Sequence, residues 1–411
     1  MIVMKFGGSS VESAAAIERV ASIVKARVER RPVVVVSAMG KTTNKLLAIA
    51  QRSIRGDRDE ALAQLQDLRE FHTREARPVI LDADWPEAER IIDRHFQELT
   101  ELVKGFAVLG ELSPRSVDAI SSYGERLSSA LVALAFRKFG MDSVHFDSRK
   151  AVVTDGRHTQ AAPIFPLTYA RLAGAVRPLA QEKVVVMGGF IGSTEAGVTT
   201  TLGRGGSDFS ASIVGAGIGA EEIQIWTDVD GMLTADPTIF RGGHRVKTIS
   251  FAEAVPCSNV IKSIACKRKI TVVNINSTRM LMAHGFLRRI FEVFDRHLTP
   301  VDVVSTSEVS VSLTIDNTAR LADICQELSQ FSEVDTEENR AIICMVGDNI
   351  RYTPGVAGRA FRAVDSVNIR MISQGASRLN LTFVVAERDL ARAVEMLHTE
   401  FFRELDPAVF D

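Results

Sequence analysis

The sequence predicts an α/β fold, a mainly parallel sheet with helices on both faces, followed by a smaller α+β region. Apolar runs of strand type recur along the chain at 1–6, 33–38, 184–190 and 222–228. Amphipathic stretches with helical spacing alternate with them, at 11–30, 44–70, 85–110 and 123–139. Strands that alternate with helices are typical of parallel sheets, which bind ligands at the carboxyl ends of their strands.

The composition is that of a soluble globular protein with two or three domains in 411 residues. A net charge of −2 excludes a broad basic surface for nucleic acid. The chain has no uncharged apolar stretch long enough to cross a bilayer and no signal-peptide pattern. Its cysteines lack metal-ligand spacing and are expected to be reduced: Cys257, Cys266, Cys325 and Cys344. We therefore expect a cytoplasmic protein without nucleic-acid or membrane partners.

The first apolar run ends in Lys5-Phe6-Gly7-Gly8-Ser9-Ser10, and a helical pattern follows. Because glycine has no Cβ, the backbone of Gly7 and Gly8 can approach a ligand closely. Strand, glycine turn and helix together point N–H groups at an anion, and Lys5 adds positive charge. The pattern favours a phosphoryl ligand, although it lacks the Walker spacing. A purely structural tight turn is the alternative.

The other apolar runs of the predicted sheet also end in Gly, Ser, Thr or Asp. Ser37-Ala38-Met39-Gly40, Gly188-Gly189-Phe190-Ile191-Gly192 and Thr227-Asp228-Val229-Asp230-Gly231 each follow such a run. Because these runs are independent of one another, packing alone does not explain the shared pattern. A ligand site at this edge of the sheet does.

Charged residues of both signs stand next to glycines in two further segments. Glu125-Arg126 is expected at the start of an apolar helix, and Arg204 and Asp208 flank glycines ahead of a helix expected over 209–217. Arginine offers a fork to a carboxylate, and a carboxylate such as Glu125 can receive an ammonium group. Together the two segments indicate a site for a small zwitterion. For Glu125-Arg126 alone, a solvated helix start is the plainer interpretation.

These features suit phosphoryl transfer, which needs charge neutralisation and alignment but little covalent chemistry from the protein. Lys5 and the amides of Gly7 and Gly8 can supply the charge neutralisation. No histidine cluster suggests a transition-metal site, so we expect Mg²⁺ to arrive with a nucleotide.

The C-terminal third contains an internal duplication. The segment that opens at Gly285 is repeated at Gly355, and 305–314 parallels 373–382. Each copy is expected to fold as strand–helix–strand–strand, which predicts a paired α+β module. Chance similarity of two βαβ units is the alternative.

Together these motifs resemble the aspartokinases of the amino-acid-kinase family over nearly the whole chain. The matching segments are 5–11, 37–44, 123–128, 203–208 and 227–231. The C-terminal duplication is similar to the paired ACT domains of this family, and 285–310 is especially close to the lysine-sensitive type.

The resemblance implies an amino-acid-kinase fold followed by two ACT (ferredoxin-like) modules. We place the catalytic domain at 1–260 and the ACT modules at 261–335 and 336–411, with interleaving of the two ACT modules as an alternative arrangement. The implied reaction is phosphorylation of the side-chain carboxylate of L-aspartate by ATP with Mg²⁺. The product, 4-phospho-L-aspartate, begins the lysine, threonine and methionine pathway. An amino-acid effector, L-lysine, and a homodimer or higher oligomer formed through the ACT modules are implied as partners.

The resemblance also carries over residue roles. Lys5 would stabilise the transferring phosphoryl group, and Asp208 would orient Lys5. Aspartate would be held by Ser37, Thr43, Glu125 and Arg204, with Glu125 on its amino group and Arg204 on its α-carboxylate. The nucleotide would contact Gly7, Gly8, Ser9, Thr227, Asp228 and Asp236. The effector would contact Met280, Gly285, Leu287, Val301, Asp302, Ser307, Glu308 and Val309.

The sequence departs from the family pattern at two places. Asp236-Pro237 is followed by Thr238, where the family usually has arginine. After Ala254 the chain lacks the family's Gly-Ala-Lys-Val-Leu-His-Pro helix and the strand beyond it. The missing lysine contacts nucleotide, so its loss would open one wall of the nucleotide site. Exposed apolar sheet surface costs about 25 cal/mol per Å².

Three origins of the shorter segment stay open: a natural form with impaired catalysis, an engineered or wrongly spliced form, and closure of the gap by oligomerisation. Two rival functions stay open with them. One is a non-catalytic amino-acid sensor that keeps the fold and the ACT pair. The other is a related kinase for another carboxylate or a carbamate, against which Glu125, Arg204 and the duplication argue.

Overall fold

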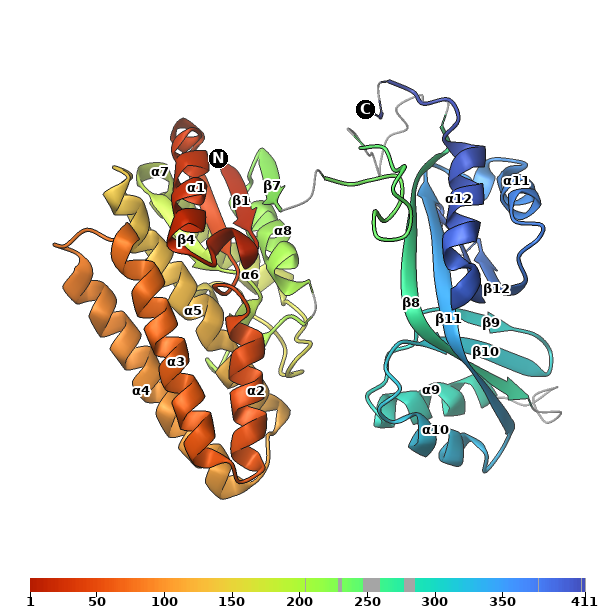
Figure 1. Ribbon diagram of the computed structural model, residues 1–411, viewed down its shortest axis with the longest axis horizontal. Helices are drawn as coiled ribbons and strands as arrows, with labels where there is room; N and C mark the ends of the chain where they lie inside the picture. Colours follow the sequence, from red (N-terminus) through yellow and green to blue (C-terminus); the bar gives the residue numbers. More distant parts are fainter. Residues whose placement is uncertain are drawn as a thin grey trace. The chain divides into compact units, whose positions relative to one another are not determined.

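The chain forms two compact units, Met1–Val229 and Asp230–Asp411 (Figure 1). The structure is a computed structural model that describes residues 1–203, 205–227, 231–246, 259–276, 285–375, 377–407 and 409–410. Each unit has its own sheet and its own hydrophobic clusters.

The first unit is built on a five-stranded sheet in the order β3-β4-β2-β1-β7, in which every pair is parallel. Its strands are β1 (Ile2–Phe6), β2 (Pro32–Val36), β3 (Ser143–Phe146), β4 (Val184–Gly188) and β7 (Glu222–Trp226). A short antiparallel hairpin, β5 (Ile191–Ser193) and β6 (Thr199–Thr201), follows β4. The predicted parallel α/β architecture is confirmed.

Helices cover both faces of this sheet. They are α1 (Ala14–Lys25), α2 (Thr42–Ile54), α3 (Arg58–Ala76), α4 (Trp85–Leu109), α5 (Pro114–Lys138), α6 (Phe165–Arg171), α7 (Arg177–Glu182) and α8 (Gly206–Ile218), with a π-helical turn, η5 (Leu172–Val176), between α6 and α7. Short 3₁₀ turns are η1 (Ser9–Val11), η2 (Val28–Arg30), η3 (Arg77–Val79) and η4 (Ser148–Lys150). Because side chains alternate along a strand, Met4 packs in the cluster that contains α1 and α5, whereas Val3 packs in the cluster that contains α8.

Three predicted helices differ in extent from those observed. The stretch 44–70 is two helices, since the chain turns at Gly56 with φ +95°. Helix α5 begins well before Glu125, because Ser113 caps it by accepting from Ser116 N (3.2 Å) and Pro114 suits the first turn. Helix α8 begins at Gly206, so Asp208 lies in its first turn rather than ahead of it.

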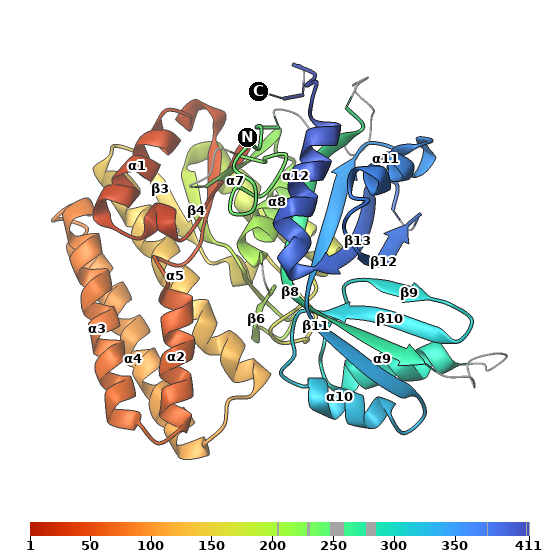
Figure 2. The same cartoon turned by 45° about the vertical axis from the view of Figure 1, so that its right-hand side comes forward.

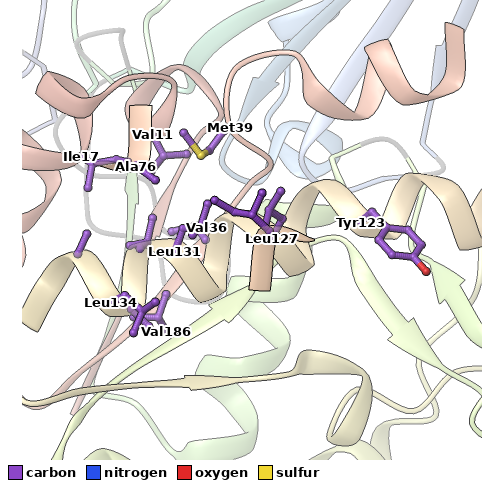
Figure 3. Packing of buried hydrophobic residues seen from close by; sticks show 14 of the residues in the cluster. Val11, Ile17, Val36, Met39, Ala76, Tyr123, Leu127, Leu131, Leu134 and Val186 are labelled. Atoms are coloured by element: carbon purple, nitrogen blue, oxygen red, sulfur yellow. The ribbon is translucent and has the colours of Figure 1, made fainter. Parts of the chain in front are cut away.

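Helix α5 runs through the main core of the first unit. Figure 3 shows Leu127, Leu131 and Leu134 of this helix packed with Val36 and Val186 of the sheet. A helix buried on most sides has an almost continuously apolar sequence, as α5 has in its second half.

The second unit holds a six-stranded antiparallel sheet in the order β12-β13-β11-β8-β10-β9. Its strands are β8 (Ile261–Asn276), β9 (Val304–Thr306), β10 (Ser310–Ile315), β11 (Glu333–Gly347), β12 (Ile369–Gln374) and β13 (Asn380–Ala386). Its helices are α9 (Phe286–Arg296), α10 (Leu321–Leu328), α11 (Val356–Ala363) and α12 (Leu390–Phe401), with 3₁₀ turns η7 (Ile350–Tyr352) and η8 (Glu387–Asp389). Figures 1 and 2 show the long strands β8 and β11 side by side, with α9 and α10 near one end and α11 and α12 near the other.

The sequence repeat corresponds to two similar halves that share these long strands. Gly285 and Gly355 open α9 and α11 with φ +80° and +85°, values that glycine adopts easily. One end of β8, with Ile261 and Ile264, packs in the cluster of α11 and α12. The other end, with Val273 and Ile275, packs in the cluster of α9 and α10. The halves are therefore interleaved, and the border that we place at 335/336 falls inside β11.

Residues 231–246 belong to the second unit, although we place the border of the catalytic domain at residue 260. Thr234 Oγ1 lies 2.8 Å from His398 Nε2 of α12, and Ile264 N donates to Thr234 O at 2.8 Å. These contacts explain why the compact units divide before residue 231. The junction after Ala254, and Cys257 with it, lie outside the described residues. Among the helices that the structure describes, none is long and apolar enough to cross a membrane.

Replacement of Leu131 tests the central role of α5. Leu131 is 1% exposed, so Leu131→Ala should lower the free energy of unfolding of the first unit by about 2–5 kcal/mol. Leu109 at the end of α4 is 70% exposed, so Leu109→Ala should change the free energy of unfolding by less than about 0.5 kcal/mol. Urea denaturation measures both, and equal effects would contradict the assigned core.

Candidate active site

Lys5 and Asp208 form an ion pair at the carboxyl end of β1. Lys5 points to the α8 face of the sheet, like Val3 two residues before it, and its Nζ lies 2.7 Å from Asp208 Oδ1. The lysine side chain is buried, whereas Asp208 is half-exposed in the first turn of α8. A helix N-terminus favours an acidic side chain there. The pair therefore fixes the direction of the lysine ammonium group.

The loop after β1 has no room for a side chain at Gly8. A Cβ there would lie 2.8 Å from Gly40 O and 2.9 Å from Ala38 O, and Gly40 N donates to Gly8 O at 3.1 Å. Gly8 has an ordinary helical φ of −63°, so space rather than backbone conformation requires glycine. The loops after β1 and β2 are thereby held against each other.

Glu125 is a buried carboxylic acid with few hydrogen-bond donors. It is 4% exposed, and Thr43 Oγ1 donates to its Oε2 at the long distance of 3.4 Å. Burial raises the pKa of Glu125 to about 8, although hydrogen bonds from backbone N–H groups, that of Ala38 first, and from Thr43 oppose the rise. A ligand ammonium group beside Glu125 would favour the ionised carboxylate.

These side chains surround one cavity of about 500 Å³ in the first unit. The described residues that line it are Lys5, Ser37, Thr43, Asn44, Leu47, Val117, Ser121, Glu125, Thr159, Phe190, Thr201, Gly203, Gly205, Gly206, Ser207 and Asp208. The structure thus brings together five of the residues selected from sequence for catalysis or aspartate binding: Lys5, Ser37, Thr43, Glu125 and Asp208.

The residues selected for nucleotide binding are not gathered in this cavity. Gly7, Gly8 and Ser9 follow β1 directly but do not line it, and Thr227 is exposed just after β7. Asp236 lies in the second unit, where its Oδ1 accepts from Thr238 N (2.8 Å) and Oγ1 (2.6 Å). Two selected residues, Arg204 and Asp228, lie outside the described residues.

Sequence reasoning missed several residues of the cavity wall. Ser121 and Val117 lie one and two helical turns before Glu125, and an earlier start for α5 would have revealed them. Phe190 lies in the segment 188–192, in which the sequence pattern draws attention to the glycines alone. Thr159 and Thr201 carry no sequence signal for this cavity, because tertiary contacts bring them there.

The residues selected for effector binding lie at three places of the second unit: the start of α9, the turn of the β9–β10 hairpin and the other end of that hairpin. Gly285 and Leu287 begin α9, and Ser307–Val309 form the turn of the β9–β10 hairpin, where Ser307 N donates to Ser310 O at 2.8 Å. At the other end of the hairpin, Asp302 N donates to Thr314 O, next to Val301. Lys267 Nζ binds Asp302 Oδ2 at 2.7 Å and Asp316 Oδ2 at 3.0 Å. Met280 lies outside the described residues.

Comparison with known proteins places this chain and its fold in a family. Residues 1–270 match the amino acid kinase family, and residues 343–401 match an ACT domain. Aspartokinase 1 of Arabidopsis thaliana, a chloroplastic protein, is 33% identical over 98% of this chain and 80% of its own length. The chain belongs to the aspartokinases of the amino acid kinase family.

Aspartokinases of known structure share the fold. The lysine-sensitive aspartokinase 3 of Escherichia coli is 30% identical over 98% of this chain and 99% of its own length. The crystal structure of E. coli aspartokinase III with aspartate and ADP, in the R-state, matches with a TM-score of 0.84 over 98% of this chain and 100% of that one. The T-state structure with lysine and aspartate matches with a TM-score of 0.76. The predicted fold class, an amino-acid-kinase domain followed by ACT modules, is confirmed.

The alignments also show that this aspartokinase chain is short. The alignment with the E. coli enzyme spans 455 positions, although this chain has 411 residues. The relative therefore carries residues that have no counterpart here. That the missing stretch follows Ala254 stays a prediction.

The raised pKa of Glu125 predicts how Glu125→Gln changes stability with pH. Between pH 4.5, its ordinary pKa, and about pH 8, the unfolded chain has released this proton while the folded chain keeps it. Wild-type stability therefore falls across this window, and the glutamine variant escapes that loss. Between pH 4.5 and pH 8, the free energy of unfolding of Glu125→Gln should rise by on the order of 2–4 kcal/mol relative to that of wild type. Denaturation at a series of pH values measures the difference, and a pH-independent difference would contradict the assignment.

Glu98 provides a control of opposite sign. Partial burial works against ionisation there, but the hydrogen bond from Tyr123 and the charge of Arg126 lower the pKa of Glu98 overall. A carboxylate with a lowered pKa stabilises the fold above its unfolded pKa. Glu98→Gln should therefore lose stability relative to wild type as the pH rises.

Proposed function

We propose that this chain transfers the γ-phosphoryl group of ATP to the side-chain carboxylate of L-aspartate. The observation that carries the proposal is the placement of Lys5, paired with Asp208, and of the buried Glu125 around one cavity. The E. coli relative that matches this fold was crystallised with aspartate and ADP. A related kinase for another carboxylate or a carbamate has no such support.

In this proposal the cavity binds aspartate as a zwitterion. The ammonium group lies against Glu125 and turns the neutral acid into a carboxylate, so that binding at neutral pH releases a proton. Arg204 takes the α-carboxylate through its guanidinium fork. Ser37 and Thr43 add hydroxyl groups at the carboxyl edge of the sheet.

The chemical step needs no general base, because the attacking side-chain carboxylate is already ionised. One of its oxygens forms a bond to the γ-phosphorus, and the bond from phosphorus to the β,γ-bridging oxygen breaks. The electron pair of that bond leaves with ADP. Lys5 stabilises the charge on the phosphoryl oxygens during transfer. No histidine is among the described residues that line the cavity, in keeping with this step.

The phosphate end of ATP fits the glycine segments of the first unit. The turn at Gly7 and Gly8 offers backbone N–H groups, and the N-terminus of α8 begins at Gly206 beside Lys5 and Asp208. Mg²⁺ would arrive with the nucleotide and neutralise phosphate charge. Among the described residues, no group of three or more His, Cys, Asp or Glu side chains is arranged to hold a metal.

Replacement of Lys5 tests the phosphoryl-transfer proposal. Lys5→Met should lower kcat by about 10²–10³ because it removes one charged donor to the transferring group. Lys25→Met, at an exposed lysine of α1, is the matched control and should leave kcat unchanged. Hydroxylamine trapping of the acyl phosphate measures turnover with ATP, Mg²⁺ and aspartate. Equal rates for Lys5→Met and wild type would contradict the proposal that Lys5 stabilises the transferring phosphoryl group.

We further propose that an amino acid, L-lysine, regulates the chain through the second unit. Lysine was crystallised with the E. coli relative in its T-state. Two groups of the selected effector residues, Ser307–Val309 and Val301–Asp302, stand at opposite ends of the β9–β10 hairpin, roughly 15 Å apart along an extended strand. One lysine molecule could contact both groups only if they came from two copies of the chain. The regulated form is therefore proposed to be a homodimer.

Asp302 provides the test of effector binding. Asp302→Asn should weaken lysine binding about tenfold, because it removes the charge proposed to face the effector. Asp316→Asn is the matched control, since Asp316 binds the same Lys267 but was not selected as an effector contact. Isothermal titration calorimetry measures both affinities. If both variants weakened lysine binding equally, the effect would come from their shared partner Lys267, and a direct contact between Asp302 and the effector would be contradicted.

A second candidate function is a regulatory relative that senses an amino acid without catalysis. The short chain favours it, since aligned relatives carry residues that this chain lacks. Calorimetry separates the two functions: lysine binding with no ATP binding and no acyl phosphate supports the sensor, and turnover supports the kinase.

A further inference from the structure

Asp118 is a fully buried carboxylate two helical turns before Glu125 on α5. It receives donors from two other segments of the chain. Thr159 N lies 3.0 and 3.1 Å from its two oxygens, and Thr201 Oγ1 donates to Oδ1 at 2.5 Å. His158 Nδ1 lies 2.7 Å from Oδ2. One side chain therefore joins α5, the turn at 157–160 and strand β6.

The segments that Asp118 joins form part of the cavity wall. Thr159 and Thr201 both line the cavity, as do Val117 and Ser121 next to Asp118 on α5. Asp118 itself does not line it. Its carboxylate is directed at its donors, so any effect on the ligand must pass through the residues that it holds.

The turn at Thr159 depends on this support. Thr159 has φ +72°, a left-handed conformation that a β-branched residue adopts only where its surroundings impose it. A Cβ on the neighbouring Gly203 would lie 3.2 Å from Thr159 O. The turn thus packs against the glycine segment that leads to the N-terminus of α8.

We propose that Asp118 is a positioning residue that sets the width of the acceptor pocket by holding Thr159 and Thr201 against α5. The inference rests on the proposed function, in which this cavity receives the amino-acid acceptor. The hydrogen-bond partners of Asp118 in the described part of the chain are His158, Thr159 and Thr201, none of which is proposed to contact the nucleotide, so we expect its effect on KM for the acceptor. A carboxyl group suits the role because both of its oxygens accept here, whereas the amide of an asparagine would turn an N–H₂ toward one of the donors.

The test compares Asp118→Asn with two variants of its partner. Thr201→Val removes the hydroxyl donor at nearly constant volume, and Thr201→Ser keeps the hydroxyl. Asp118→Asn and Thr201→Val should each raise KM for aspartate about tenfold while KM for ATP stays within about twofold, because small displacements of a pocket wall act strongly on ligand fit. Thr201→Ser should restore most of the wild-type value. Asp84→Asn is the control, because Asp84 pairs with Arg137 near the far end of the same helix.

Hydrogen–deuterium exchange supplies a readout that does not depend on activity. The backbone N–H of Thr159 donates to the Asp118 carboxylate. A peptide covering 155–164 should therefore exchange faster in Asp118→Asn and Thr201→Val. Its exchange should not change in Asp84→Asn. Equal rises in both KM values, or unchanged exchange of this peptide, would overturn the inference. If the wild-type chain does not phosphorylate aspartate, the proposed function is wrong. The exchange result alone then decides whether Asp118 holds the Thr159 turn in place.

Discussion

The first unit depends on the close approach of α5 to the carboxyl ends of β2 and β4. A Cβ on Gly124 would lie 2.7 Å from Ala38 Cβ and 2.9 Å from Thr43 Oγ1. A Cβ on Gly188 would lie 3.0 Å from Glu125 O. Glycine at both positions lets the helix lie directly against the strand ends, so the next residue, Glu125, is buried at the cavity rather than exposed.

This approach gives the cavity two kinds of charged group. The Lys5 ammonium is already paired with Asp208, so its direction is fixed before any ligand arrives. Among the described residues no cation contacts Glu125, and burial favours its neutral form. A preformed ion pair suits a step that needs a fixed charge, whereas a buried neutral acid suits recognition of a cation that comes with the ligand. The two roles proposed for these residues follow from that difference.

The sequence predicted those parts of the fold and site that local pattern determines. Lys5 was found because a strand, a glycine turn and a helix follow one another within a few residues. Glu125 stands out as a carboxylate beside glycine, but the apolar run that begins near it predicts a helix start there, whereas the capping signal of α5 lies earlier, at Ser113 and Pro114. Asp118 gave no signal, because its partners Thr159 and Thr201 are 41 and 83 residues away along the chain. Contacts at such separations exist only once the fold has formed.

The same limit applies to domain borders. Motifs place 231–246 with the catalytic domain, and the match to the amino acid kinase family also runs to residue 270, whereas packing of Thr234 against His398 joins this segment to the second compact unit. Asp236 is part of that segment. A residue selected for nucleotide binding is therefore attached to the unit with the ACT fold, which no local pattern could indicate.

The sharing of β8 and β11 by the two halves of the second unit has a consequence for folding. Each long strand contributes side chains to the cores at both ends, so neither half can be excised without leaving strand edges unpaired. Although the repeat in the sequence suggests two separate modules, the folded unit has one sheet whose long strands β8 and β11 belong to both halves. A deletion of either half would therefore remove part of the core of the other.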